Sequence, residues 1–355
     1  DIAVGTPKNK IDCADLEKKL REKYDNIAWI SCELKGTRLN ISINETISPK
    51  MIKENTFINL IHPGRGVFGS DFGTVSFVIR KKHITRCNGV YRKLFYVQGN
   101  VDSPENLEKE FLNGDQVFVS CQDRFREIAG MPIAYWCSDA MYIVFEKAEA
   151  MKKYADPRRG TVTGDDARFL RYWQEIDISK FSLNERLKWI AFNKGGDFRR
   201  WYGNNYFVAN WENDGFEIKN FKDSKGKLRS RPQNTGYFFM RGITWTYITS
   251  YKKCFRYYPS GYGFSGGGPG LFPHKEEDIK YILGYYNSVV YDELMKVMGA
   301  TTISLESGEV EKSPIIINGV DKDRVNEIVD ASVEISKKDW DSFETSWDFK
   351  KHPLV

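Results

Sequence analysis

The sequence predicts a mixed α/β fold, and three observations support this prediction. Helix-start pairs, Ser48-Pro49 and Ser103-Pro104, open segments with helical patterns, because serine caps a helix and proline is tolerated in its first turn. A continuous apolar segment typical of a buried strand, GTVSFVIRKK at 73–82, lies between them, and GVYRKLFYV at 89–97 predicts another strand after a turn at Asn88-Gly89. Residues 190–260 then form short apolar segments and glycine-rich loops, which favour an α+β domain.

The first 47 residues predict a small α/β module. IDCADLEKKLREKY, 11–24, has helical spacing and begins near Asp12 or Asp15. IAWISCELKG predicts a strand, and TRLNISINE predicts a second, half-buried strand because apolar and polar residues alternate. A boundary is expected near residue 47, and SPKMIKENTFINLI, 48–61, then predicts a helix with Ser48 as its N-cap and Pro49 as its first residue.

Later segments predict further elements. SPENLEKEFL predicts a short helix capped by Ser103 or Asp102, and PIAYW, 132–136, has the pattern of a strand. EEDIKYILGYYNSVVYDELMKVMG, 276–299, predicts one helix with Gly299 at its C-cap. The apolar face of this helix is expected to hold Ile279, Ile282, Leu283, Tyr286, Val290 and Leu294. DKDRVNEIVDASVEIS predicts a C-terminal helix, followed by an acidic and aromatic end, DWDSFETSWDF.

Composition excludes several classes of protein. No apolar run approaches the ~18–20 residues that span a bilayer, so a cytoplasmic protein is expected. The chain begins with Asp1 and shows no signal peptide, which predicts a fragment or a processed piece. Four scattered histidines and six scattered cysteines predict neither a metal site nor a catalytic triad. GFSGGGPG, 263–270, lacks the Lys-Ser or Lys-Thr of a phosphate loop, so a glycine loop is expected there.

Charge is concentrated in the middle of the chain. Residues 156–260 hold 20 Lys and Arg against 11 Asp and Glu, whereas residues 261–355 hold 10 against 17. A local basic excess attracts polyanions. KGGDFRRWYGNN, 194–205, and KGKLRSRPQN, 225–234, add aromatic and amide side chains to this excess, and RRGTVTGDDARF, 158–169, predicts a structured loop anchored by Phe169.

This mixture predicts a nucleic-acid surface, although Trp201, Trp211 and Trp245 would also suit a hydrophobic core. Cations neutralise phosphates, amides bind base edges, and aromatic rings stack on unpaired bases. We expect phosphate contacts from Lys194, Arg199, Arg200, Lys227, Arg229 and Arg231. Base-edge contacts are expected from Asn204, Asn205, Gln233 and Asn234, and stacking from Trp201 and Tyr202.

From about residue 50 onward the chain resembles the PglX family of adenine-specific DNA methyltransferases from BREX phage-defence systems. The resemblance rests on QDRFREIAGMPIAYWCSD, RRGTVTGDDARFLRYW, FNKGGDFRRWYGNN and GKLRSRPQNTGYFF, among other strings. It implies an enzyme that transfers methyl from S-adenosylmethionine to adenine N6, flips the target base, and reads DNA with a C-terminal lobe. The family's Asn-Pro-Pro-Tyr loop and its glycine-rich cofactor turn are absent from this sequence. No catalytic or cofactor-binding residue is therefore assigned.

The resemblance implies four regions. Residues from about 5 to 45 resemble the module of YqfD-type sporulation proteins through the DNIAWISCELKGTRL string, and residues 1–47 are expected to be a small α/β module of different origin. Residues 48–122 are expected to be the terminal strands of a Rossmann-like methyltransferase sheet, residues 123–300 the target-recognition domain, and residues 301–355 a helical, acidic-aromatic tail.

Three functions remain open on the sequence alone. The first is DNA recognition for methylation, with a separate catalytic half or other BREX components as partners. The second is a DNA-binding module without chemistry, and the third is a sporulation-type structural module joined by a chance fusion. The partner that the first two share is double-stranded DNA.

Overall fold

The computed structural model describes most of the chain. The described residues are 27–35, 38–45, 49–67, 73–96, 102–128, 131–249, 252–298, 304–352 and 354, with residues 7, 11–13, 16 and 20. They belong to two compact units, unit 1 (Asp1–Trp136) and unit 2 (Cys137–Val355). Both units combine helices with sheets, which confirms the predicted mixed α/β class. Within the described residues, no helix is both long and apolar enough to cross a membrane.

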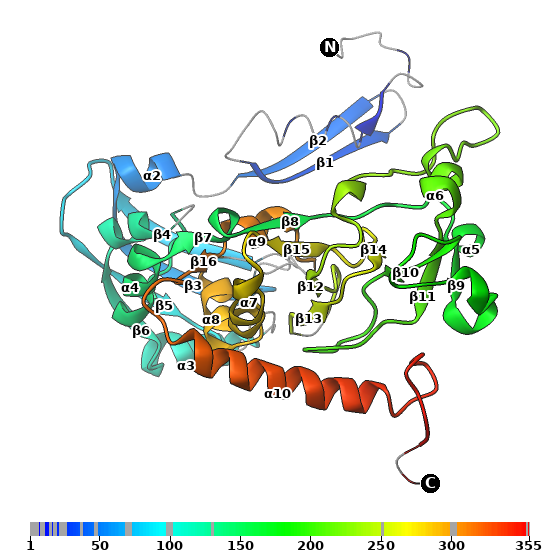
Figure 1. The fold of residues 1–355 in the computed structure, drawn as a ribbon. Helices are drawn as coiled ribbons and strands as arrows, with labels where there is room; N and C mark the ends of the chain where they lie inside the picture. Colours follow the sequence, from blue (N-terminus) through cyan, green and yellow to red (C-terminus); the bar gives the residue numbers. More distant parts are fainter. Residues whose placement is uncertain are drawn as a thin grey trace. The chain divides into compact units, whose positions relative to one another are not determined.

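Unit 1 begins with the two predicted strands, which are confirmed. β1 (Ile27–Lys35) pairs with β2 (Arg38–Glu45) as an antiparallel hairpin (Figure 1). The helix predicted from Asp12 lies mostly outside the described residues. Among those described, Cys13, Leu16 and Leu20 are helical, and Leu16 N donates to Asp12 O at 3.0 Å.

The main sheet of unit 1 has four strands in the order β4-β3-β5-β6. β3 is parallel to β5, and the outer pairs are antiparallel. One face packs Leu60 and Tyr91 against Ile52, Phe125 and Tyr135. Unit 1 therefore extends to Trp136, beyond residue 123, the expected start of the recognition domain. The elements are α2 (Pro49–Glu54), β3 (Thr56–Arg65), β4 (Gly73–Arg80), β5 (Asn88–Lys93), α3 (Pro104–Asn113), β6 (Val117–Cys121) and a 3-10 helix, Gln122–Glu127.

Several local predictions for unit 1 need correction. The helix expected over 48–61 ends at Glu54, because Thr56 starts a strand that the sheet pairs on both sides. GTVSFVIRKK does form a strand, but it is the sheet's edge and is largely exposed, with Val78 61% exposed. The strand expected over 89–97 ends at Lys93, and PIAYW forms no strand. The predicted helix α3 is confirmed, with Ser103 as its N-cap, whereas Ser48 lies outside the described residues.

Unit 2 is built on two four-stranded sheets (Figure 1). The first has the order β14-β10-β11-β9 and is formed by β14 (Tyr262–Phe264), β10 (Trp189–Asn193), β11 (Phe207–Asn210) and β9 (Leu170–Tyr172). The second has the order β13-β12-β15-β8 and is formed by β13 (Phe255–Tyr258), β12 (Gly242–Trp245), β15 (Gly270–Pro273) and β8 (Ala155–Arg158). A short pair joins β16 (Pro314–Ile315) to β7 (Glu149–Ala150).

Helices and short turns complete unit 2. The helices are α4 (Asp139–Lys147), α5 (Asp166–Phe169), α6 (Glu212–Lys219), α7 (Ile279–Tyr286), α8 (Val289–Val297), α9 (Ser307–Lys312) and α10 (Lys322–Trp340). The short 3-10 helices are Met151–Lys153, Trp173–Glu175, Ile178–Lys180, Thr235–Tyr237 and Glu276–Asp278. α10 runs beside α7, where Gly284 leaves room for Val325 and Val329 (Figure 1).

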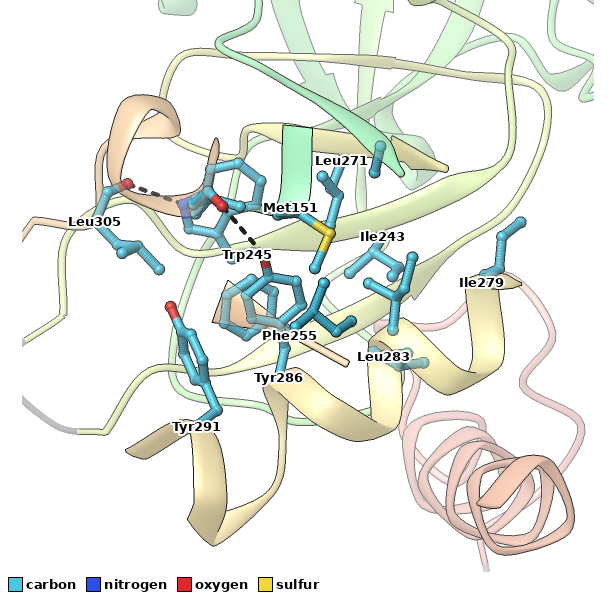
Figure 2. Packing of buried hydrophobic residues seen from close by; sticks show 14 of the residues in the cluster. Met151, Ile243, Trp245, Phe255, Leu271, Ile279, Leu283, Tyr286, Tyr291 and Leu305 are labelled. Carbon is cyan, nitrogen blue, oxygen red and sulfur yellow. Dashed lines mark hydrogen bonds between the residues drawn. The ribbon is translucent and has the colours of Figure 1, made fainter. Parts of the chain in front are cut away.

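The core of unit 2 lies between the second sheet and α7 and α8. Figure 2 shows Phe255 from the sheet beside Tyr286 of α7, and Trp245 and Leu283 belong to the same cluster. Trp245 Nε1 donates to Leu305 O at 3.0 Å, which satisfies the only polar atom of a fully buried indole. Trp211 is buried in a second cluster with Phe238 and Ile190. The core interpretation of Trp211 and Trp245 is therefore confirmed.

The single helix predicted over 276–299 is wrong, because the structure has two. α7 ends at Tyr286, and Ser288 caps α8 by accepting a hydrogen bond from Tyr291 N. Asn287 interrupts the helix by hydrogen bonding with Phe255, accepting from its N–H at 3.1 Å and donating to its carbonyl at 2.9 Å. Val290 is consequently half exposed rather than buried. The other five residues of the predicted face are buried, and Gly299 lies outside the described residues.

Candidate nucleic-acid interface

The segment after α6 folds into a narrow turn whose shape depends on Asp223. Asp223 N donates to Lys227 O at 2.9 Å, and Arg229 N donates to Phe221 O at 2.9 Å. The Asp223 carboxylate accepts hydrogen bonds from the N–H groups of Lys225 and Lys227, both at 2.9 Å. Asp and Gly are typical of such turns, because Asp bonds backbone two residues on and Gly226 adopts φ +78°. Residues 221–231 are called the basic hairpin below.

The basic hairpin presents five exposed cations: Lys222, Lys225, Lys227, Arg229 and Arg231. Within the part of the chain that the structure describes, no carboxylate forms an ion pair with any of them. Asp223, the hairpin's one acidic residue, is held by backbone N–H groups of the turn. The five positive charges are therefore directed to solvent and available to an anionic ligand.

The loop at residues 158–169, which the sequence predicts to be structured, supports the basic hairpin. Val162 and Arg231 form a β-bridge, with Val162 N to Arg231 O at 3.0 Å and Arg231 N to Val162 O at 2.7 Å. Gly164 has φ +82°, and a Cβ on it would lie 2.8 Å from the Arg229 carbonyl carbon. Only glycine fits this position without displacing the hairpin. Phe169 is fully buried, as expected for an anchor.

Arg168 is a further cation beside the basic hairpin that the sequence interpretation did not assign. Its guanidinium lies over the rings of Phe169 and Phe221, 5.2 Å from each centroid, and its nearest carboxylate is Glu217 at 3.6 Å. Arg229 lies over the same Phe221 ring at 5.4 Å. Phe221 thus holds two arginines in place. In the sequence, the sign of this role was a single aromatic residue between two lysines, in KNFKD at 219–223.

Gln233 and Asn234 bind the backbone that follows β8 instead of extending into solvent. Gln233 Nε2 donates to Gly160 O at 2.9 Å, and Asn234 Nδ2 donates to Arg159 O at 2.8 Å. Asn234 has φ +56°, which asparagine tolerates better than most residues. Because their amide groups are engaged by backbone, this geometry gives these two side chains a structural role and does not favour the predicted base-edge contacts.

The cations of the 194–205 stretch are paired with carboxylates. Arg199 bonds Asp339 at 2.7 Å and lies over the Trp340 ring at 5.0 Å. Arg200 lies 3.5 Å from Asp292. These carboxylates come from α10 and α8, more than ninety residues away in sequence. The predicted phosphate contacts of both arginines would require these ion pairs to break.

Lys194 is also paired, through Asp166 of α5 at 2.5 Å. Partial burial opposes ionisation of Asp166, but hydrogen bonds from Lys194 and Thr163, together with the lysine charge, lower its pKa. Lys194 also lies 5.4 Å from the Phe207 ring centroid. Its ammonium is therefore engaged on two sides by its own unit.

The remaining predicted residues of this stretch are buried or partly buried. Tyr202 is 6% exposed beneath Lys337, so the predicted stacking on a base would require this ring to leave its position. Asn204 and Asn205 are 4% and 7% exposed, and Asn204 Nδ2 donates to Asp197 O at 2.9 Å. A base edge cannot reach either amide in this conformation. Trp201 is partly buried against the core of unit 2 and has φ +71°.

Arg256, which the sequence interpretation missed, organises this stretch from within. It is fully buried, and its guanidinium donates to Arg199 O at 3.2 Å, Thr246 Oγ1 at 3.1 Å and Gly195 O at 3.4 Å. Burial lowers its pKa, although Cys254 opposes this change. A buried guanidinium needs several acceptors, and the turn at Gly195 and Gly196 supplies part of them. An arginine inside the apolar strand FRYY was the available signal.

Comparisons with known proteins found relatives that match over most of the chain. Residues 1–67 match the family model described as "Putative stage IV sporulation protein YqfD". The adenine-specific methyltransferase BrxX of Escherichia coli O9:H4 (strain HS) is 32% identical over 324 residues, covering 89% of this chain and 25% of that protein. The adenine-specific methyltransferase PglX of Lacticaseibacillus casei (strain Zhang) is 31% identical over 317 residues, covering 84% of this chain and 26% of that protein.

Among solved structures, the type IIG restriction endonuclease BpuSI matches with a TM-score of 0.37 and 10% identity, over 79% of this chain and 39% of that one. This similarity is too low to carry an argument about fold or function. The chain spans about a quarter of the length of the curated relatives it matches. The resemblance expected from the sequence is confirmed: over most of its length this chain is a relative of the adenine-specific methyltransferases BrxX and PglX.

Proposed function

We propose that this chain contacts double-stranded DNA through the basic hairpin of unit 2, as the target-recognition part of a BREX-type adenine-N6 methyltransferase. The observation that supports it most is the set of five exposed hairpin cations that lack carboxylate partners among the described residues. The similarity to adenine-specific methyltransferases supplies the reaction to which this contact would contribute.

The physical basis of the contact is charge neutralisation. Lys and Arg side chains on a protruding turn reach phosphate oxygens, and each neutralised phosphate releases counterions. The glycine at position 164 and the amides of Gln233 and Asn234 hold the hairpin in a fixed orientation. A fixed orientation favours a defined register on the duplex over loose electrostatic attraction.

S-adenosylmethionine is the methyl donor that the relatives imply, but the described residues do not fit it. A pocket of about 310 Å³ beside Trp211 is lined by Arg186, Leu187, Lys188, Glu212, Asn213 and Asp214. It lies at a strained left-handed turn, with Asn213 and Asp214 at φ +52° and +58°, and not at a glycine-rich turn between a strand and a helix. No step of methyl transfer is therefore assigned to residues of this chain.

The regions of the chain fit this proposal as follows. We propose that residues 48–122 complete a methyltransferase sheet, supported by the parallel pair β3 and β5 in a mixed sheet. Residues 123–300 would hold the recognition domain, and residues 301–355 a tail whose Asp339 and Trp340 engage Arg199. A separate catalytic half and other BREX components are the proposed partners.

A second candidate concerns residues 1–47 alone. The match of residues 1–67 to the sporulation family supports a module of different origin at this end of the chain. If this module determined the function, the chain would act as a sporulation-type structural module, joined to the rest by a chance fusion. Such a chain would have no affinity for DNA.

Titration of the chain against a labelled DNA duplex tests the proposal. We expect affinity at about 50 mM salt that falls steeply by about 200 mM, because phosphate contacts dominate such binding. Addition of S-adenosylmethionine should leave the isotherm unchanged. Absence of binding at low salt would contradict the proposed function, and cofactor-dependent binding would contradict the assignment of no cofactor site.

A further inference from the structure

Unit 1 carries a second surface rich in cations, at the turn between β4 and β5. Residues 80–88 contain Arg80, Lys81, Lys82 and Arg86, and no Asp or Glu. All four of these side chains are exposed. Within the described residues, no carboxylate forms an ion pair with Arg80, Lys81 or Lys82.

Hydrogen bonds to the side chains of Thr56 and Asp123 hold this turn. Thr56 is fully buried, and its hydroxyl donates to Lys82 O at 2.7 Å while accepting from Ile84 N at 2.8 Å. Asp123 accepts from Arg86 N at 2.9 Å and contacts His83 Nε2 at 2.8 Å. The backbone is thus fixed from both sides of the turn, and the two lysines are left in solvent.

Among the described residues, Asp123 is the carboxylate that contacts this turn, and it is already engaged by Arg86 N, His83 and Arg126. Burial opposes its ionisation, but hydrogen bonds from Arg86 N and His83, with the charges of His83 and Arg126, lower its pKa. Arg126 lies 4.0 Å from it and is itself exposed. Glu127 is the adjacent exposed carboxylate. The exposed cations of the turn outnumber it, so this surface carries an excess of positive charge.

The turn shares its construction with the basic hairpin. In both, a carboxylate accepts hydrogen bonds from backbone N–H groups. Asp223 accepts from Lys225 N and Lys227 N in the hairpin, and Asp123 accepts from Arg86 N in the turn. In both, exposed lysines without ion-pair partners among the described residues project from a backbone fixed in this way. A cation that has no carboxylate partner breaks no ion pair when it binds a phosphate, and a backbone already held in place loses little freedom on binding.

We propose that residues 80–88 together with Arg126 form a second phosphate-contacting surface, which takes the phosphodiester backbone of double-stranded DNA. This inference rests on the proposed function for the identity of the polyanion, but assigns DNA contact to unit 1 as well. It predicts that the basic hairpin supplies only part of the chain's salt-dependent affinity.

The test is a salt series of duplex titrations with the whole chain carrying Lys81→Ala/Lys82→Ala. Loss of two phosphate contacts should make the negative slope of log affinity against log salt shallower by about 1.8. Affinity should fall roughly tenfold or more at about 0.1 M salt. Lys350→Ala/Lys351→Ala removes two adjacent exposed lysines from unit 2 and serves as the matched control. Thermal melting of each variant verifies folding.

The outcomes separate this inference from the proposed function. A slope unchanged by Lys81→Ala/Lys82→Ala, or changed no more than by the control, overturns the inference, even where hairpin substitutions abolish binding. A shallower slope in the turn variant with no effect of hairpin substitutions sustains the inference and contradicts the hairpin assignment. A wild-type chain without affinity for the duplex at low salt overturns both.

Discussion

The stretch at residues 194–205 and the basic hairpin at residues 221–231 both carry several cations, but these cations have opposite surroundings. Lys194, Arg199 and Arg200 each meet a carboxylate from a distant helix, at 2.5, 2.7 and 3.5 Å. The hairpin cations meet none within the described residues. The difference teaches that the number of cations in a segment does not identify a polyanion surface; the position of the carboxylates does.

The two segments also use their aromatic residues differently. In the first, Tyr202 is buried and Trp340 covers Arg199, so the rings belong to the interior of unit 2. In the second, Phe221 lies beneath Arg168 and Arg229 and supports cations that stay accessible. An aromatic-basic pattern can therefore be either an internal clamp or a binding surface.

The largest expected effect concerns the hairpin charges. Lys227→Ala/Arg229→Ala/Arg231→Ala should lower duplex affinity on the order of a hundredfold at about 0.1 M salt, because three phosphate contacts are lost. The backbone bridge between Arg231 and Val162 does not need the side chain, so folding should be retained. Lys152→Ala/Lys350→Ala/Lys351→Ala removes as much charge from exposed positions of unit 2. Equal losses in both variants would show that only net charge matters.

The support of the hairpin is the next most sensitive feature. Gly164→Ala combines a positive φ with a contact of 2.8 Å to the Arg229 backbone, and we expect a cost of about 1–3 kcal/mol with weakened DNA binding. Gly226→Ala is the matched control, since it has φ +78° but no atom within 4 Å of the added Cβ. Melting curves and titrations measure both variants. Equal stability and affinity would argue against the hairpin being held by the loop.

A smaller effect is expected at Arg199. Arg199→Ala removes one ion pair and one cation–π contact, so stability should fall by about 1 kcal/mol. Duplex affinity should be unchanged, because the side chain is engaged by α10. A double-mutant cycle with Asp339→Ala isolates the pair. A loss of affinity without a loss of stability would show that DNA displaces Asp339.

The smallest expected effect is a pH dependence at Asp166. Its pKa in the folded state is lowered below the ordinary value of 3.8, so its stabilising effect is present above that value and disappears as the pH falls through the lower one. The difference in melting temperature between wild type and Asp166→Asn should therefore shrink as the pH falls below about 4. Asp165→Asn, which can still cap α5, is the control. A difference independent of pH would contradict the ion pair with Lys194.

Local patterns were sufficient for elements whose cause is local. Ser103 and Pro104 predicted the start of α3, and the alternation of Leu39, Ile41 and Ile43 predicted β2, because capping and pleating act within a few residues. The resemblance carried by FNKGGDFRRWYGNN and related strings was sufficient for the relationship to the methyltransferases.

Long-range contacts explain what the sequence could not predict. Nothing near Arg199 indicates that Asp339, 140 residues later, neutralises it. The apolar run of β4 predicts a buried strand, but its place at the sheet edge leaves Val78 exposed. Asn287 breaks a helix of regular spacing because it bonds Phe255 on a distant strand. Within the site, Lys227, Arg229 and Arg231 were predicted from composition, whereas the burial of Asn204 and Asn205 depends on tertiary packing.

The most direct test of the central claim compares the two segments in one salt series. Duplex titrations would be made with wild type, with Lys227→Ala/Arg229→Ala/Arg231→Ala, and with Lys194→Ala/Arg199→Ala/Arg200→Ala. We predict that the hairpin variant makes the negative slope of log affinity against log salt shallower by about 2.7. The other variant should keep the wild-type slope and lose thermal stability. A shallower slope in the 194–200 variant with a wild-type slope in the hairpin variant would contradict this prediction.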